Sequence, residues 1–347
     1  MRTHTTHTAH VAPARTTRRS RTARTVLCVT TLIACVPYLA LKIAWVAGSR
    51  IGIPEGSALR RDSNSLMALN ALTVLMDAAV IVLAFLLTRP WGGGTSHALK
   101  AWGRVPSWLL ALPMWGATGL LAPIVAVFPA QTLAAAVRGG SPGDGGGSPD
   151  ALLAPWVWTL VYTGFIVQAL ALGTLFVLYA RERWAHLWRG RIGALPDSPT
   201  RSARRLTAAA VAVLSLLPAT THLLWASGST TGLNPARAAA MDLDARLNDA
   251  GYVLFALLAA AGALTLGYGR GRRVPLLLPL AAAWIGSGAL AGWGGWLTLT
   301  TLSVAAGDPK LPSPLLSLTY AVQMIVGMLV AVAGAHFFAE REAARCA

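Results

Sequence analysis

Charged residues are scarce in this chain: 12% of its 347 residues are Asp, Glu, Lys or Arg, whereas 55% are apolar. Soluble proteins carry about 25% charged residues, so most of this chain cannot face water. Cysteine is also scarce, and Cys28 and Cys35 stand two helical turns apart, about 10 Å, which is too far for a disulfide within one helix. No Walker loop, HExxH motif or GxSxG motif occurs in a suitable context. The composition therefore indicates a membrane protein, and no motif identifies an enzyme.

Eight apolar runs are long enough to cross a bilayer, since about 20 residues span the roughly 30 Å hydrocarbon layer as a helix. The sequence therefore predicts an all-α fold, a polytopic transmembrane helix bundle. The predicted spans are residues 25–48, 66–88, 107–128, 155–180, 206–228, 251–269, 278–302 and 315–339. The third span is the weakest, because Pro113 and Pro123 interrupt it.

The basic residues lie mainly between the apolar runs. A net charge of +16 would suit nucleic acid if the cations formed one continuous face, but this spacing suits a lipid bilayer as the partner and no nucleic acid. With the N-terminus inside, 21 Lys and Arg residues are cytoplasmic and 7 lie on the other side, with Lys42 within a span. Because cytoplasmic loops are rich in Lys and Arg, both termini are predicted to be cytoplasmic. The same assignment places Asp249 in an outer loop.

The basic N-terminus followed by an apolar run also has the form of a signal peptide, and Arg18 with Arg19 superficially matches a twin-arginine signal. The run is too long for the apolar region of a signal peptide and has no clear small-x-small cleavage site, so we interpret it as a retained span. Residues 1–24 then form a disordered, basic cytoplasmic tail. Three histidines in it could bind a metal, but their threonine-rich surroundings favour disorder; they are His4, His7 and His10.

The two halves of the chain share residues at equal spacing, which indicates an internal duplication. The residues Arg24, Trp45, Gly48, Ser49, Gly52, Trp115, Gly119, Tyr162, Glu182 and Arg183 match Arg204, Trp225, Gly228, Ser229, Gly232, Trp284, Gly288, Tyr320, Glu340 and Arg341. Only the second and sixth spans align poorly. Because each half has four spans, we expect two parallel four-helix repeats at residues 25–180 and 206–339. A basic cytoplasmic linker at 181–205 joins them, and a cytoplasmic tail follows at 340–347.

Four ionisable residues lie within the predicted spans, where each costs at least about 2.5 kcal/mol on insertion scales. Lys42 and His222 each stand three residues before a tryptophan, Asp77 is near the middle of the second span, and His336 is near the cytoplasmic end of the eighth. We interpret Lys42, Asp77 and His222 as a pathway for a substrate or ion, with Lys42 and Asp77 close enough in depth to pair. The alternative is structural: Lys42 extends to the interface, and the others hold helices together.

No cofactor is expected. His222 and His336 differ in depth by about 20 Å, too far to share a metal ion or haem iron. The arginine-rich, lysine-poor spans and the segment W-V-A-G-S-R-I-G at 45–52 resemble multi-pass membrane proteins of actinobacteria. This resemblance implies a bacterial plasma membrane location and transfers no functional residue.

Three functions fit the sequence. The first is a carrier or channel for a small solute or ion between the two repeats, with helices broken at prolines supplying backbone groups for binding; these prolines are Pro37, Pro113, Pro123 and Pro218. The second is a non-catalytic membrane scaffold, sensor or accessory subunit whose basic loops contact a partner or anionic lipid. The third, an intramembrane enzyme, lacks a recognisable nucleophile or metal set. Neither the oligomeric state nor a protein partner follows from the sequence.

Overall fold

The computed structural model describes residues 14–55, 57, 63–88, 107–139, 153–195, 200–301 and 311–346. Within these ranges the chain forms helices joined by turns. The helices are α1 (Ala14–Val46), α2 (Ser63–Thr88), α4 (Ala111–Val137), α5 (Pro155–Trp188), α6 (Arg201–Ala226), α7 (Pro235–Ala239), α8 (Leu243–Tyr268), α9 (Leu277–Thr301) and α10 (Pro314–Cys346). All but the short α7 are long and apolar enough to cross a membrane. The all-α fold with eight candidate spans is therefore confirmed.

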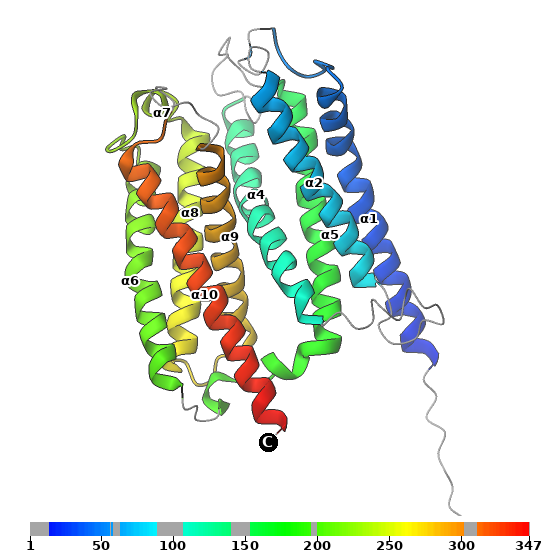
Figure 1. The fold of residues 1–347 in the computed structure, drawn as a ribbon, viewed down its shortest axis with the longest axis vertical. Coiled ribbons are helices and arrows are strands. Elements are labelled where there is room, and N and C mark those ends of the chain that lie inside the picture. Colours follow the sequence, from blue (N-terminus) through cyan, green and yellow to red (C-terminus); the bar gives the residue numbers. More distant parts are fainter. Residues whose placement is uncertain are drawn as a thin grey trace, which may run out of the picture.

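The helices form two groups that stand side by side (Figure 1). One group contains α1, α2, α4 and α5, and the other contains α6, α8, α9 and α10, with α4 packed against α9 where the groups meet. The first turns of α1 and the last turns of α10 lie at the same end of the bundle, and α7 lies at the opposite end. Below, these are called the terminal end and the α7 end.

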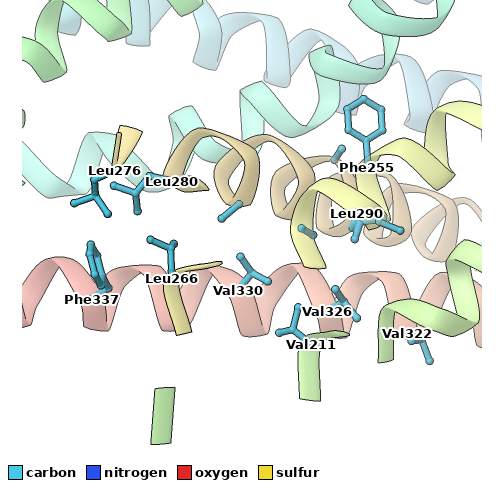
Figure 2. Close-up of a cluster of buried hydrophobic side chains, with 14 of the residues drawn as sticks. Val211, Phe255, Leu266, Leu276, Leu280, Leu290, Val322, Val326, Val330 and Phe337 are labelled. Atoms are coloured by element: carbon cyan, nitrogen blue, oxygen red, sulfur yellow. The ribbon is translucent and has the colours of Figure 1, made fainter. Parts of the chain in front are cut away.

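Each group has its own apolar core. In the second group, Phe255 of α8, Leu290 of α9 and Val326 of α10 belong to one buried cluster (Figure 2), whereas Leu83 and Leu172 belong to a separate cluster in the first. Large apolar side chains also point outward from each long helix. They include Ile33, Leu75, Leu112, Leu170, Val213, Leu257, Leu278 and Val332. Exposing such a large apolar surface to water is unfavourable, whereas contact with hydrocarbon is favourable, so the bundle contacts a lipid bilayer.

The two groups meet at a glycine contact, here called the α4–α9 seam. A methyl group at Gly119 of α4 would overlap the backbone of Gly288 of α9, so the two helices touch through their main chains. Above and below this point, Trp115 Nε1 donates to Ser287 Oγ at 2.9 Å, and Trp293 Nε1 donates to the Leu120 carbonyl at 3.1 Å. Small residues at the contact allow the close approach, and the indole groups fix its register.

The connection between the groups pairs with the turn between α8 and α9. Ile192 N–H donates to the Val274 carbonyl at 3.1 Å, and Gly193 N–H donates to the Arg272 carbonyl at 3.0 Å. Both ends of the predicted linker at 181–205 are helical, because α5 continues to Trp188 and α6 begins at Arg201. The first group is therefore tied to the second at the terminal end by main-chain hydrogen bonds.

Three sequence expectations about helix ends are wrong. Pro37, Pro123 and Pro218 each lie inside a continuous helix, because neighbouring groups in a membrane bundle compensate for the missing proline donor; the described helices are not broken there. The helix α1 begins at Ala14, so residues 14–24 are helical rather than disordered. The histidines of the tail lie outside the described residues. Finally, α8 begins at Leu243, which places Asp249 within a span rather than in an outer loop.

Candidate functional site

Matching turns close the α7 end of α1 and of α6. Trp45 Nε1 donates to the Ile51 carbonyl at 2.8 Å, and Trp225 Nε1 donates to the Thr231 carbonyl at 3.0 Å. Both turns use glycines with positive φ, a conformation that favours glycine; these are Gly48 at 89°, Gly52 at 73°, Gly228 at 99° and Gly232 at 74°. These turns fix the ends of α1 and α6 just beyond Lys42 and His222.

In the second group, His222 of α6 lies at the centre of a fully buried polar cluster. Its Nδ1 is 2.8 Å from Asp249 Oδ1 of α8, and its Nε2 is 2.7 Å from the amide nitrogen of Gln323 of α10. The His222 ring stacks on Tyr252 with 4.7 Å between ring centres. His222, Asp249 and Gln323 are each at most 1% exposed. Because an amide nitrogen only donates, Nε2 accepts, and the ring proton sits on Nδ1 facing Asp249.

Some polar atoms around this cluster have no hydrogen-bond partner. They are Gln323 Oε1 and Tyr320 Oη of α10. A buried polar group without a partner costs about 1–3 kcal/mol, so native proteins rarely leave several together. The second group therefore holds both a paired acid and base and unused hydrogen-bonding capacity.

In the first group, Lys42 of α1 stands three residues before Trp45, as His222 of α6 stands three residues before Trp225. Its Nζ donates to Asn70 Oδ1 of α2 at 2.7 Å. The ammonium also lies over the Tyr38 and Trp45 rings, 5.0 and 5.2 Å from their centres. Lys42 is 9% exposed, so its charge does not simply extend into water. The contacts with Asn70 and the two rings therefore account for the position of the Lys42 ammonium, without any extension to the membrane–water interface.

Asp77 of α2 is 5% exposed, and its Oδ2 is buried without a hydrogen-bond partner. It interacts electrostatically with Lys42, yet no ion pair within 4 Å joins the two among the described side chains. The structure thus brings Lys42 and Asp77 into one neighbourhood without a direct bond. Burying a carboxylate oxygen without a hydrogen-bond partner costs free energy. Asp77 is therefore the first group's strongest candidate for a functional residue.

The predicted pathway residues fall on opposite sides of the α4–α9 seam. Lys42 and Asp77 belong to the first group and His222 to the second. The fourth intramembrane residue, His336, is 56% exposed at its side chain and lies 3.2 Å from Glu340, one turn further along α10. The polar residues therefore lie inside each group rather than between the groups.

Sequence reasoning missed the partners in both clusters. Asp249 was assigned to a loop, and Asn70 and Gln323 are neutral residues within spans that attract little notice. A usable signal was the spacing, because 28 residues separate Lys42 from Asn70 and 27 separate His222 from Asp249.

Charged pairs at the terminal end also occur in both groups. Arg24 of α1 pairs with Glu182 of α5, and Arg204 of α6 lies 3.8 Å from Glu340 of α10. Arg183 lies over the Tyr179 ring at 5.0 Å, and Arg341 over the Phe337 ring at 5.9 Å. The Arg–Glu pairs join the first and last helix of each group, whereas the arginine–ring contacts lie within the last helix of each group.

Among the described residues, no three His, Cys, Asp or Glu side chains gather as a metal site would require. The chain matches no protein-family model, no curated protein and no solved structure. Its function must therefore be argued from the buried polar clusters and from the arrangement of the helices around them.

Proposed function

We propose that this protein is a carrier or channel for a small solute or ion, and that the ionisable residues buried in each group form its pathway. The observation that carries the proposal is the His222–Asp249 pair with Gln323, together with Lys42 at a similar place in the other group and buried Asp77 further along α2. Ionisable groups within membrane spans are expensive and mark ion or substrate pathways in many membrane proteins. Two such clusters in one chain therefore support a pathway in each group.

The proposal includes an internal duplication, with residues 25–180 and 206–339 as parallel four-helix repeats. It is supported by contacts that recur at matching residues. The tryptophan turns recur, as do the Arg–Glu pairs at the terminal end. Gly52 and Gly232 provide a further match, because a methyl group at either would overlap Val157 or Leu315, which both lie near the start of the last helix of their group. Parallel repeats with sites in the membrane are common in transporters.

We further propose that the terminal end is cytoplasmic and that the membrane is a bacterial plasma membrane. The excess of Lys and Arg in the segments at the terminal end supports this orientation, and the resemblance to actinobacterial proteins supports the location. The α7 end then faces the cell exterior.

The test is charge movement across a membrane. Protein reconstituted into vesicles is adsorbed on a solid-supported membrane, and currents are recorded as small ions and organic solutes are exchanged. We expect the wild type to give solute-dependent currents that protein-free vesicles lack. Asp77→Asn and Asp249→Asn should lower these currents at least about 10-fold, because a buried ionisable group in a pathway contributes more than 1.4 kcal/mol to the limiting step.

Glu342→Gln is the matched control, since it removes a carboxylate whose side chain is 52% exposed at the terminal end and lies outside the pathway. It should leave the currents unchanged. No current from the wild type with any solute, or full currents from both Asp variants, contradicts the carrier.

The alternative is a non-catalytic scaffold, sensor or accessory subunit. One observation favours it: the two groups touch through bare backbone at Gly119 and Gly288, which leaves no room for a solute at that depth between them. A scaffold predicts no current in any condition. It also predicts that the protein is recovered from native membranes with a stable partner after mild detergent extraction.

A further inference from the structure

A pocket of about 270 Å³ lies at the α7 end of the second group. It is formed by α7 and by the ends of α9 and α10. Its polar lining is Asn234, Arg237, Thr300, Thr301 and Tyr320, and its apolar lining includes Leu297, Pro312 and Leu316. Pockets for drug-sized ligands range from about 300 to 1,000 Å³. This one is slightly smaller, so it suits a smaller organic molecule with one polar end.

Tyr320 connects this pocket to the buried cluster. The residue lines the pocket, although it is only 3% exposed, and its Oη is buried without a hydrogen-bond partner. One turn further along α10, Gln323 meets His222. A hydroxyl left without a partner beside a pocket is a hydrogen-bonding group that a ligand can satisfy.

Arg237 supplies the charge of the pocket. No ion pair within 4 Å engages its guanidinium among the described side chains, yet it interacts electrostatically with Tyr320 below it. The short helix α7 holds it in place, because Asn234 Oδ1 accepts from Arg237 N–H at 2.7 Å and Asn234 Nδ2 donates to the Leu311 carbonyl at 2.6 Å. An unpaired arginine with a planar fork of donors is the usual protein group for binding a carboxylate.

We propose that this pocket binds a small monocarboxylate with an apolar body, whose carboxylate meets Arg237 and Tyr320 while its body contacts Leu297 and Leu316. One guanidinium balances one negative charge, which favours a monoanion over a phosphate dianion. The pocket lies directly before the His222 cluster, so it is the entry site of the second group. In this respect the inference rests on the proposed carrier function and names its substrate class.

The test is direct binding to the full chain in nanodiscs of zwitterionic phosphatidylcholine, which leave no anionic lipid headgroup to compete. Benzoate, phenyl phosphate and the neutral benzyl alcohol are titrated by calorimetry. We expect benzoate to bind more tightly than phenyl phosphate, and benzyl alcohol to bind at least about 10-fold more weakly than benzoate, as is typical when a charge-assisted hydrogen bond is lost. Repeating the benzoate titration with added phosphatidylglycerol shows whether an anionic lipid headgroup competes for the same site.

Two variants locate the site. Arg237→Gln should weaken benzoate binding at least about 10-fold, and Tyr320→Phe should weaken it about 3-fold. The matched controls are Arg50→Gln, which removes an exposed arginine at the α7 end of the first group, and Tyr162→Phe, which removes the corresponding hydroxyl of the first group; both should bind as the wild type does. Thermal unfolding of each variant checks that the fold is intact.

Several results overturn the inference: no benzoate binding by the wild type, equal binding of benzyl alcohol, phenyl phosphate binding more tightly than benzoate, or wild-type affinity in Arg237→Gln. Displacement of benzoate by phosphatidylglycerol but unchanged variants would also overturn it, since the site would then lie elsewhere. If benzoate binding depends on Arg237 but the protein gives no current, the pocket is supported and the carrier proposal is rejected. Currents that depend on Asp77 without benzoate binding support the carrier and remove the pocket.

Discussion

The two groups of helices have the same frame but different buried charges. Both close the α7 end with an indole N–H donated across a glycine turn, and both pair an Arg of the first helix with a Glu of the last. Three residues before the tryptophan of each turn, however, one has Lys42 bonded to Asn70, and the other has His222 held between Asp249 and Gln323. The shared parts close the helix ends and hold the helices of each group together. The parts that differ are therefore where we expect the specific function of each group.

The comparison presupposes that the groups pack through the α4–α9 seam, and the largest expected effect tests this. Gly119→Ala should destabilise the protein by about 3 kcal/mol or more, at the upper end of the cost of overpacking, because its methyl group would overlap the rigid Gly288 backbone. Unfolding by SDS in mixed micelles measures the change. The control is Gly116→Ala on the same helix, which has open space around the new methyl group. It should be neutral or gain up to about 1 kcal/mol in helix propensity; equal effects of the two variants would show that the seam is not tight.

The buried clusters give the next largest effect, and here the halves should differ. Asp249→Ala should cost about 2–3 kcal/mol, since His222 is fully buried between Tyr252 and Gln323 and cannot turn toward another partner. Asn70→Ala should cost about 1 kcal/mol, because the flexible stem of Lys42 lets its ammonium move toward the interface. The same SDS titration compares the two. A larger loss for Asn70→Ala would mean that Lys42 is the more tightly held group.

The smallest effect concerns the charged pairs at the terminal end. Glu340 is 21% exposed and contacts Arg204, His336 and Thr200, whereas Glu182 is 60% exposed at its side chain and pairs with Arg24. Glu340→Gln should therefore cost about 1 kcal/mol and Glu182→Gln less than about 0.5 kcal/mol. Thermal unfolding at low and high salt resolves the pair, because screening should remove the effect of Glu182→Gln first. Equal losses that salt does not change would point to hydrogen bonding rather than charge.

The sequence was sufficient for the fold class because the apolar runs reflect the thickness of the bilayer, which is the same for every chain. It was not sufficient for helix ends. Apolar residues become dense only from Gly251, which predicts a helix start there, but α8 begins at Leu243 and includes Asp249. A hydropathy count scores Asp249 as a loop residue, because it does not register that the carboxylate is paired with the His222 ring. The partner of His222 could therefore be identified only from the three-dimensional structure.

The site could be predicted only in part for the same reason. Lys42, Asp77 and His222 stood out because charges are rare in spans, and all three are buried. Whether these three side chains converge depends on which helices are neighbours. The spacing of residues along the chain does not show that the α4–α9 seam separates Lys42 and Asp77 from His222. Neutral partners such as Asn70 and Gln323 are invisible to charge counting, although they take part in two of the three hydrogen bonds described for Lys42 and His222.

The backbone contact between Gly119 and Gly288 also limits how the molecule can move. Interleaved side chains can slide by changing rotamer, whereas two main chains in direct contact have no such freedom. We therefore expect α4 and α9 to behave as a static central spine, and any cycle of opening and closing to occur in the outer helices of one group without requiring the other.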